Sequence, residues 1–344
     1  MTSSLDIEQP EALIAYLQAT GRIAASERPV VRVLGGGVSN RTVLVERETG
    51  EAWVLKQALE KLRVASDWFS SPERIHREAD GLRWLGQLAP LGSTVAYVFE
   101  DHTHHILAMQ AVPQPHQNWK TMLMNGALHL EQVRQFGTML GILESRALER
   151  RHEIERVFND RTFFETLRLE PYYAYTASLE PEAANFLHAL INDTRTNRIT
   201  LVHGDYSPKN VLVYQNRLIL VDHEVIHFGD PAFDLGFSMT HLLCKAHHLI
   251  AHRVAFLEAA RQYWQAYSEA ANGLLTPQLE ARAVRHTLAC LLARVCGRSP
   301  LEYLDQSERT RQRRIVIDLI SSIPTGMNSL IDAFAQKLQE VVTT

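Results

Sequence analysis

The sequence predicts an α+β protein of two lobes, a β-rich N-terminal lobe followed by a mostly helical C-terminal lobe. Residues 30–58, VVRVLGGGVSNRTVLVERETGEAWVLKQA, predict three strands separated by a Gly-rich turn and a second turn. Beyond Pro113 and Pro115, which mark the expected hinge, apolar residues recur mostly at helical spacing. We therefore expect residues 1–112 to form the first lobe and residues 113–344 the second.

The first lobe is expected to contain two helices and five strands. Leu13, Ile14 and Leu17 lie on one face of the first expected helix, and Pro72 suits the first turn of the second. The predicted elements are a helix over residues 9–20, the three strands within residues 30–58, a helix over 72–88, and strands over 94–100 and 104–110.

The second lobe is expected to be helical except for one irregular segment, residues 199–222, which predicts a loop followed by a β-hairpin. No repeat or low-complexity tract interrupts the pattern. The predicted helices cover residues 118–126, 129–150, 160–168, 181–195, 235–248, 251–272, 277–296, 307–320 and 327–342.

Composition bounds the class of protein. The 344 residues are 46% hydrophobic and 22% charged, with a formal net charge of -4, so nothing favours disorder or a nucleic-acid partner. The N-terminus carries early acidic residues, and no window approaches the apolar length of a membrane span. Cys244, Cys290 and Cys296 lack metal-ligand spacing, which predicts reduced thiols. We expect a cytoplasmic monomer or homodimer without a membrane partner.

The segment LVHGDYSPKNVL carries the clearest chemistry. His203, Asp205 and Asn210 follow an H-x-D-x-x-x-x-N spacing, which we expect to place the Asp and the Asn on opposite sides of one turn. A carboxylate that accepts a hydroxyl proton, next to a neutral Asn that binds Mg²⁺, is what phosphoryl transfer from ATP requires. We predict Asp205 as the catalytic base and Asn210 as a metal ligand, with His203 holding the loop.

A second acidic pair follows the hairpin. Asp222 ends the apolar strand Leu218–Val221, and Glu224 is expected on the same side because strand side chains alternate. Carboxylates at a strand end suit a hard divalent cation, so both are candidate Mg²⁺ ligands, although an Asp in this position can also simply start a turn. Asp234 is expected to cap the next helix or to brace the catalytic loop.

The Gly-rich turn and a strand lysine are candidates for binding the phosphates of ATP. Glycines let the backbone approach phosphate oxygens closely, although a Gly-rich hairpin can equally be a flexible turn. Lys56 lies within an apolar strand, and Glu78 of the following helix is its preferred partner over Glu73 and Asp80. The residues predicted for the turn are Gly35, Gly36, Gly37, Ser39 and Asn40.

These segments resemble the aminoglycoside phosphotransferase and choline kinase superfamily, which has a protein-kinase-like fold. HGDYSPKNVL resembles its catalytic loop, and LVDHEVIHFGDPAFDLG resembles its metal-binding segment. The likeness spans nearly the whole chain. It implies that the first lobe binds ATP, that Lys56 and Glu78 position the phosphates, and that the backbone around Gln110–Val112 receives adenine. Gln110 and Val112 are therefore candidate cofactor-binding residues.

Two stretches resemble methylthioribose kinases in particular. These are KQA with the following LRVA and DW, and the D-x-E segment at Asp222 and Glu224. Asn210 departs from that branch, whose loop has a small hydroxyl residue there. The branch's paired arginines for the sugar have no clear counterpart except Arg294, our candidate substrate residue. The resemblance implies a kinase acting on a sugar or sugar-like alcohol.

The charges of the expected acceptor region leave the substrate open. A polycationic aminoglycoside would favour an acidic pocket, whereas this region is mildly basic, which favours a neutral or anionic acceptor. An aminoglycoside or amino alcohol remains the alternative, as does a catalytically silent nucleotide-binding regulator. The basic residues between 235 and 303 are Lys245, Arg253, Arg261, Arg282, Arg285, Arg294 and Arg298, against Glu258, Glu269, Glu280 and Glu302.

Overall fold

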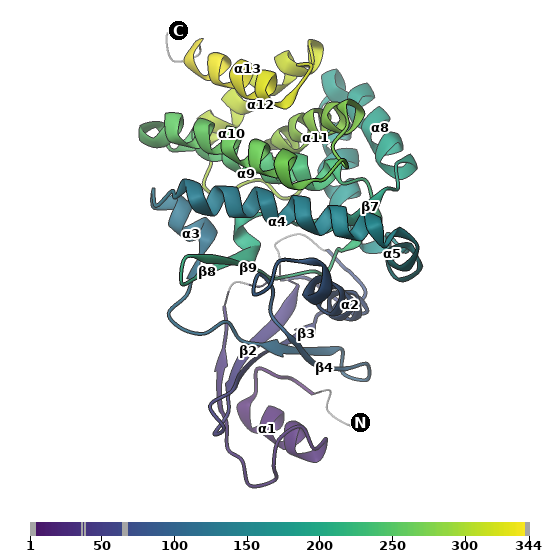
Figure 1. Ribbon diagram of the computed structural model, residues 1–344, viewed down its shortest axis with the longest axis vertical. Helices are drawn as coiled ribbons and strands as arrows, with labels where there is room; N and C mark the ends of the chain where they lie inside the picture. Colours follow the sequence, from purple (N-terminus) through teal and green to yellow (C-terminus); the bar gives the residue numbers. More distant parts are fainter. Residues whose placement is uncertain (1–4, 36, 38, 64–67, 341–344) are drawn as a thin grey trace. The chain divides into compact units, whose positions relative to one another are not determined.

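The computed structural model describes residues 5–35, 37, 39–63 and 68–340 (Figure 1). Contacts between Cα atoms divide the chain into two compact units. The first unit comprises Met1–Gln87, Thr94–His116 and Val221–Glu224, and the second comprises Leu88–Ser93, Gln117–Leu220 and Val225–Thr344. The division of roles between residues 1–112 and 113–344 stays a prediction.

The first unit is built on one antiparallel sheet with the strand order β1-β2-β3-β5-β4. Val43, Val45 and Leu55 are fully buried because alternate strand side chains point to the same face, and Leu13 and Leu17 pack against that face. The elements are α1 (Pro10–Ala19), β1 (Val30–Val33), β2 (Asn40–Glu46), β3 (Ala52–Ala58), α2 (Arg74–Leu88), β4 (Tyr97–Asp101) and β5 (Ile106–Gln110).

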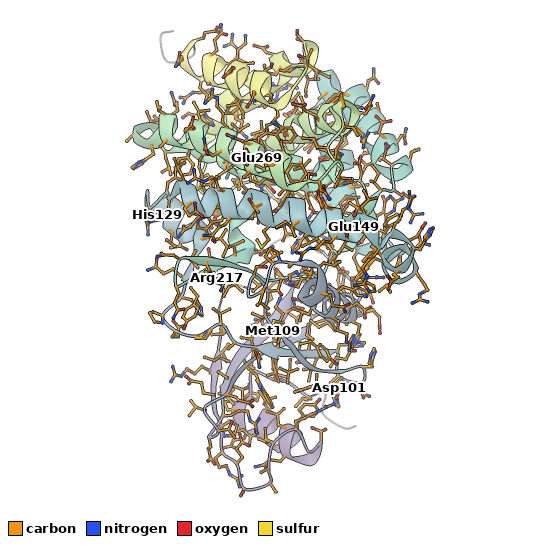
Figure 2. The ribbon with its side chains drawn as sticks, in the orientation of Figure 1. Asp101, Met109, His129, Glu149, Arg217 and Glu269 are labelled. Atoms are coloured by element: carbon orange, nitrogen blue, oxygen red, sulfur yellow. The ribbon has the colours of Figure 1, made fainter. Side chains whose placement is uncertain are left out.

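The second unit is mostly helical. The helix α10 packs against both α4 and α9 (Figure 1), and His129 and Glu149 mark the two ends of α4 (Figure 2). Its longer helices are α4 (Leu130–Glu149), α8 (Pro181–Thr196), α9 (Ala232–His248), α10 (Arg253–Ala270), α11 (Pro277–Cys296), α12 (Gln306–Ser321) and α13 (Met327–Glu340). Its short helices are α3 (Trp119–Met124), α5 (Arg151–Phe158), α6 (Thr162–Phe164) and α7 (Tyr175–Leu179).

Close helix packing fixes the core of this unit. A Cβ atom on Gly137 of α4 would lie 2.4 Å from the Tyr263 carbonyl of α10, so the two backbones meet where only glycine fits. Every residue of α9 from Ala232 to His247 is buried. This burial on all sides places α9 in the centre of the unit, just after the loop that carries the predicted chemistry.

Short strands hold the predicted catalytic segment. β7 pairs with β10, while β6, β8 and β9 form a small antiparallel sheet. A single 3₁₀ turn, η2, joins the loop after β7 to β8. The bounds are β6 (Gln117–Asn118), β7 (Thr200–Val202), η2 (Pro208–Asn210), β8 (Val211–Tyr214), β9 (Arg217–Leu220) and β10 (His227–Gly229).

The predicted α+β architecture is confirmed, and three local features differ from the prediction. The helix expected over residues 160–168 continues as a π-helix, η1 (Glu165–Ala174), which contains Pro171. Proline has no N–H to donate, so the regular α-helical bonds cannot pass through it. The helix α5 and the helix α7 were not predicted, because their few turns give no sustained period. No helix among the described residues is long and apolar enough to cross a membrane.

Candidate active site

In the first unit, the strand lysine contacts two carboxylates. The Nζ atom of Lys56, on β3, lies 2.7 Å from Oε1 of Glu78 on α2 and 2.8 Å from Oδ1 of Asp222. The rival partners are engaged elsewhere, since Glu73 contacts His105 and Asp80 contacts Arg83. The pairing of Lys56 with Glu78 is thus present, while its role toward phosphates stays a prediction.

Burial and neighbouring charges shift the pKa values of the residues in this cluster. Burial alone would lower the pKa of Lys56, but the carboxylates of Asp222 and Glu78 outweigh it and raise that pKa above its ordinary value. Burial raises the pKa of Glu78 to about 7 despite the neighbouring ammonium. Two carboxylates therefore share one cation, which leaves the cluster with excess negative charge.

A buried arginine, Arg74, ties several segments of the first unit together. Its guanidinium lies 3.2 Å from Oε2 of Glu224 and donates to the carbonyl oxygens of Ser39 and Leu59. It also donates to the carbonyls of Ser70 and Ser71. Arg74 has no exposed side-chain surface, so these contacts satisfy its donors inside the protein. It therefore joins the end of the Gly-rich turn, the end of β3 and the acidic segment.

The Gly-rich turn is described only in part. Gly35 and Gly37 are exposed, whereas Ser39 and Asn40 are buried at the start of β2. The Ser39 carbonyl accepts the N–H of Leu59 at 3.0 Å besides the Arg74 guanidinium. Gly36 lies outside the described residues. The exit of the turn is therefore anchored to the lysine strand.

The predicted adenine-binding segment follows β5. The Gln110 N–H donates to the Ala96 carbonyl at 2.8 Å, and the Val112 carbonyl accepts from Nδ1 of His116 at 3.1 Å. The Gln110 N–H is thus committed to the sheet. Any contact with adenine would use other backbone groups of Gln110–Val112, and the role of both residues stays a prediction.

In the second unit, one oxygen of Asp205 is held from two sides. Its Oδ2 accepts a hydrogen bond from Nδ2 of Asn210 at 2.7 Å and lies 3.0 Å from the Arg168 guanidinium. The expectation that Asp and Asn occupy opposite sides of a turn is wrong, because η2 brings the two side chains into direct contact. Both of these contacts go to Oδ2, so within the described residues Oδ1 remains able to accept a proton.

Hydrogen bonds to Asp234 hold the backbone of the loop that carries Asp205. The carboxylate of Asp234 accepts the N–H groups of His203 at 2.6 Å and Gly204 at 2.8 Å. Gly204 has φ +77, and a Cβ atom there would lie 2.9 Å from the Val225 carbonyl, so the turn requires glycine. His203 accepts the Asp205 N–H on Nδ1 at 3.2 Å. Burial raises the pKa of Asp234 to about 7 against these two backbone hydrogen bonds.

The two acidic residues after the hairpin do not lie on one face of a strand. β9 ends at Leu220, and Asp222 has φ 71, a left-handed conformation that breaks the alternation of an extended chain. Asp222 contacts Lys56, while Glu224 contacts Arg74. The expectation that both carboxylates lie on the same side of a strand is therefore wrong.

The predicted metal ligands present oxygen donors of the type that Mg²⁺ prefers. In the first unit, Asp222 is 24% exposed in its side chain and Glu224 is 12% exposed, so both carboxylates reach the surface. In the second unit, Nδ2 of Asn210 binds Asp205, which turns its oxygen away from that carboxylate. These donors fit a hard divalent cation, and Glu224 would share its charge with Arg74.

Two further predicted features are the stretch around Trp68 and the candidate substrate residue Arg294. Trp68 accepts the Leu62 N–H on its carbonyl at 2.9 Å, but residues 64–67 of the same stretch lie outside the described residues. Arg294 is 9% exposed and donates to the hydroxyl of Tyr172 and to Ser299. Arg294 is close enough to Asp205 to interact with it electrostatically.

Two residues of the candidate site were not predicted from the sequence, namely Arg74 and Arg168. Arg168 lies in the π-helix, and its guanidinium also donates to the carbonyl of Gly204 at 2.7 Å. Neither arginine carries a motif, and both belong to a chain with many arginines. The only available signal was position, since Arg74 shares its helix with Glu78.

Comparison with known proteins places the chain in a family. The model of a phosphotransferase enzyme family matches residues 30–274, more than half of the chain. Methylthioribose kinase of Pectobacterium atrosepticum is 25% identical over 291 residues, covering 74% of this chain and 72% of that protein. Methylthioribose kinase 2 of Oryza sativa subsp. japonica is 22% identical and is covered over 61% of its length, against 67% of this chain.

The fold agrees with that family. The structure of amicoumacin kinase hAmiN in complex with AMP-PNP, Ca²⁺ and Ami matches with a TM-score of 0.58 at 16% identity, covering 86% of this chain and 89% of that one. This likeness concerns the kinase-like fold, and the family match carries the activity. The chain therefore belongs to the phosphotransferase enzyme family and is an ATP-dependent small-molecule kinase.

Proposed function

We propose that this kinase transfers the γ-phosphate of ATP to a hydroxyl of a small metabolite, a sugar or sugar-like alcohol, with Mg²⁺ as its metal. The methylthioribose kinase relatives support a sugar-like acceptor at about one-quarter identity. One observation carries the proposal: Asp205 has one oxygen fixed by Arg168 and Asn210, and the other is able to take a proton. This is the arrangement of an oriented general base.

The first unit supplies the nucleotide side of the reaction. Lys56, held by Glu78, would place its ammonium against the α- and β-phosphates. The Gly-rich turn from Gly35 to Asn40 would cover the phosphates, and the backbone of Gln110–Val112 would receive adenine. Asp222, Glu224 and Asn210 are the proposed ligands of Mg²⁺, which would supply positive charge to the phosphates.

The second unit supplies the acceptor side. Oδ1 of Asp205 would accept the proton of the acceptor hydroxyl, whose oxygen then bonds to the γ-phosphorus as the bond to the β-phosphate oxygen breaks and ADP leaves. Arg168 fixes the other oxygen, so the carboxylate cannot rotate away. Asp234 holds the backbone of the loop and therefore acts as a positioning residue.

The main alternatives are an aminoglycoside or amino alcohol kinase and a silent regulator. A cationic acceptor would meet Arg168, Lys245 and Arg294 in the second unit, which opposes it electrostatically. A regulator would tolerate loss of the base, whereas Lys56, Glu78, Asp205 and Asn210 are all present and engaged. A cytoplasmic location and a monomeric or homodimeric state stay predictions.

An ADP-release screen tests the proposal. The purified protein is incubated with Mg²⁺-ATP and a panel of sugars, sugar acids, thiosugars, amino alcohols and aminoglycosides. We expect acceptor-dependent ADP release for a sugar-like member, and its loss in Asp205→Asn. Tight ATP binding without turnover across the whole panel would instead support the regulator.

A further inference from the structure

A fully buried lysine in the second unit has no carboxylate partner among the residues that the structure describes. Lys245, on α9, has no exposed surface, and its ammonium donates to the main-chain carbonyl of His241 at 3.2 Å. Within the described part of the chain it forms no ion pair. A buried charge that is neither paired nor replaced by an apolar side chain is costly for stability. The stability of the fold therefore does not explain why a lysine occupies position 245.

A second buried cation, Arg294, lies in the same cluster. Its guanidinium binds neutral groups only, namely the Tyr172 hydroxyl at 2.9 Å and the carbonyl and hydroxyl of Ser299. Its Nε atom is buried without a hydrogen-bond partner in the described structure, and the same holds for the hydroxyl of Tyr303. The Tyr303 ring centre is 5.8 Å from Nζ of Lys245. Two cations and two unused donors thus converge in one place.

This cation pair, Lys245 and Arg294, is linked to the proposed base through one aromatic ring. The Cζ atoms of Arg168 and Arg294 lie 5.9 and 5.6 Å from the centre of the Tyr172 ring. Arg168 in turn contacts the Asp205 carboxylate at 3.0 Å. Arg294 therefore lies within the reach of a small molecule whose hydroxyl is held at Asp205, and its charge acts on Lys245.

The other charged groups nearby do not neutralise the pair. Lys120 adds positive charge, and Glu302, whose charge acts on Lys245, pairs with Lys120 and is 66% exposed. Glu308, whose charge acts on Tyr303, pairs with His248. Burial lowers the pKa of Lys245 to about 7, and Lys120 and Arg294 push it in the same direction. Burial likewise lowers the pKa of His241, so this neighbour adds no further positive charge. Among the described residues, positive charge here exceeds negative charge.

We propose that Lys245 and Arg294, with the Tyr303 hydroxyl, bind an anionic group of the acceptor, a carboxylate or a phosphate. The acceptor class is therefore a hydroxylated sugar acid or a sugar phosphate rather than a neutral sugar. This inference rests on the proposed kinase function, because it assumes that the acceptor hydroxyl is held at Asp205. An anion would restore the full charge of Lys245 and use the donors that the fold leaves unpaired.

Matched acceptor pairs test the inference. The members of each pair differ at one terminal hydroxymethyl group, which a carboxylate replaces or a phosphate esterifies: glycerol with glycerate, ribitol with ribonate, and ribose with ribose 5-phosphate. ADP release with Mg²⁺-ATP gives kcat/KM for each member. We expect the anionic member to be preferred, and Lys245→Met to reduce that preference roughly 30-fold or more, as loss of a buried charge contact does. Carboxylate and phosphate members show which group is recognised.

Controls separate this inference from the proposed function. Lys337→Met removes a lysine of α13 that contacts Asp318 and should keep the preference. Tyr303→Phe removes a hydroxyl without a charge and should weaken it if Lys245→Met fails to fold. Turnover of neutral members at equal or higher kcat/KM, unchanged in the variants, would overturn the anion inference and leave the kinase intact.

A binding measurement covers the remaining case. If no acceptor supports ADP release, the proposed function fails, and inorganic phosphate and sulfate then probe the cation pair alone. We expect both anions to raise the melting temperature of the wild type and of Lys337→Met more than that of Lys245→Met. Equal shifts in all three proteins would contradict an anion site at Lys245.

Discussion

The two units differ in whether their buried cations have carboxylate partners. In the first unit, Lys56 contacts Glu78 and Asp222, and Arg74 contacts Glu224, so each of these cations has a carboxylate beside it. In the second unit, Arg168 contacts Asp205, but among the described residues Lys245 donates to a backbone carbonyl and contacts no carboxylate. Each of these cations in the first unit thus has a carboxylate beside it, whereas Lys245 does not.

This difference indicates which part of the site is general and which part is specific. Cations that are already paired with carboxylates can hold their geometry before the nucleotide binds. This suits a nucleotide that is common to the kinases of the family. A buried cation without an anionic partner lowers stability, and binding of an anion offsets this loss. We therefore interpret the second unit as the source of acceptor specificity.

The largest expected effect is on the proposed base. Asp205→Asn keeps the shape of the side chain but removes the proton acceptor, so kcat should fall by about 10²–10⁴-fold while ATP binding is retained. Steady-state ADP release and ATP titration measure the two quantities. Asp193→Asn, which changes an exposed carboxylate of the same unit, is the matched control. A wild-type kcat in Asp205→Asn would refute the assignment.

A large loss of stability is expected when Arg74 is replaced. Arg74→Met removes the ion pair with Glu224 and the donors that bind several buried carbonyl groups, so the free energy of unfolding should drop by about 3–5 kcal/mol. Urea denaturation measures this change. Arg32→Met, which changes an exposed arginine of the same unit in contact with Glu46, provides the comparison, and equal losses in the two variants would show that Arg74 has no special structural role.

A smaller effect is expected from the partner of the strand lysine. Glu78→Gln keeps the hydrogen bond to Lys56 but loses its charge, while Asp222 still contacts the ammonium. We predict that kcat/KM for ATP falls about tenfold, equivalent to about 1.4 kcal/mol. Glu73→Gln, an exposed acid one turn earlier, should change little. Similar effects of the two substitutions would contradict the assigned pairing.

The last effect is expressed per pH unit and concerns the pH dependence of stability. Because the folded-state pKa of Lys245 is about 7, below the ordinary value of lysine, the unfolded chain holds more protons between these two values. The wild type should therefore gain stability as the pH rises from 7 to about 10, by at most about 1.4 kcal/mol per pH unit. Lys245→Met should lack this gain. Parallel stability curves from denaturation at each pH would count against a buried, uncompensated ammonium.

The sequence predicted the parts of the site that depend on local pattern. The H-x-D-x-x-x-x-N spacing indicated Asp205 and Asn210, and the helix after β3 indicated Glu78, because motif spacing and periodicity are visible in one dimension. The left-handed conformation of Asp222 left no such trace, so the separation of the two acidic residues was missed.

Long-range contacts of arginine were equally invisible. Arg74 looks like its neighbour Arg77 in the sequence, and only the folded chain brings Ser39, Leu59 and Glu224 to its guanidinium. Arg168 lies where a proline-containing π-helix breaks the α-helical period, so its contact with Asp205 could not be read from spacing. The buried state of Lys245 likewise depends on helix packing.

The division of roles between the two units is tested most directly by the kinetics of Lys245→Met with both substrates. KM for ATP and KM for the preferred anionic acceptor are measured in the variant and in the wild type. The account predicts that KM for the acceptor rises roughly 30-fold or more, while KM for ATP stays unchanged. A parallel rise in both constants, or no change in either, would contradict it.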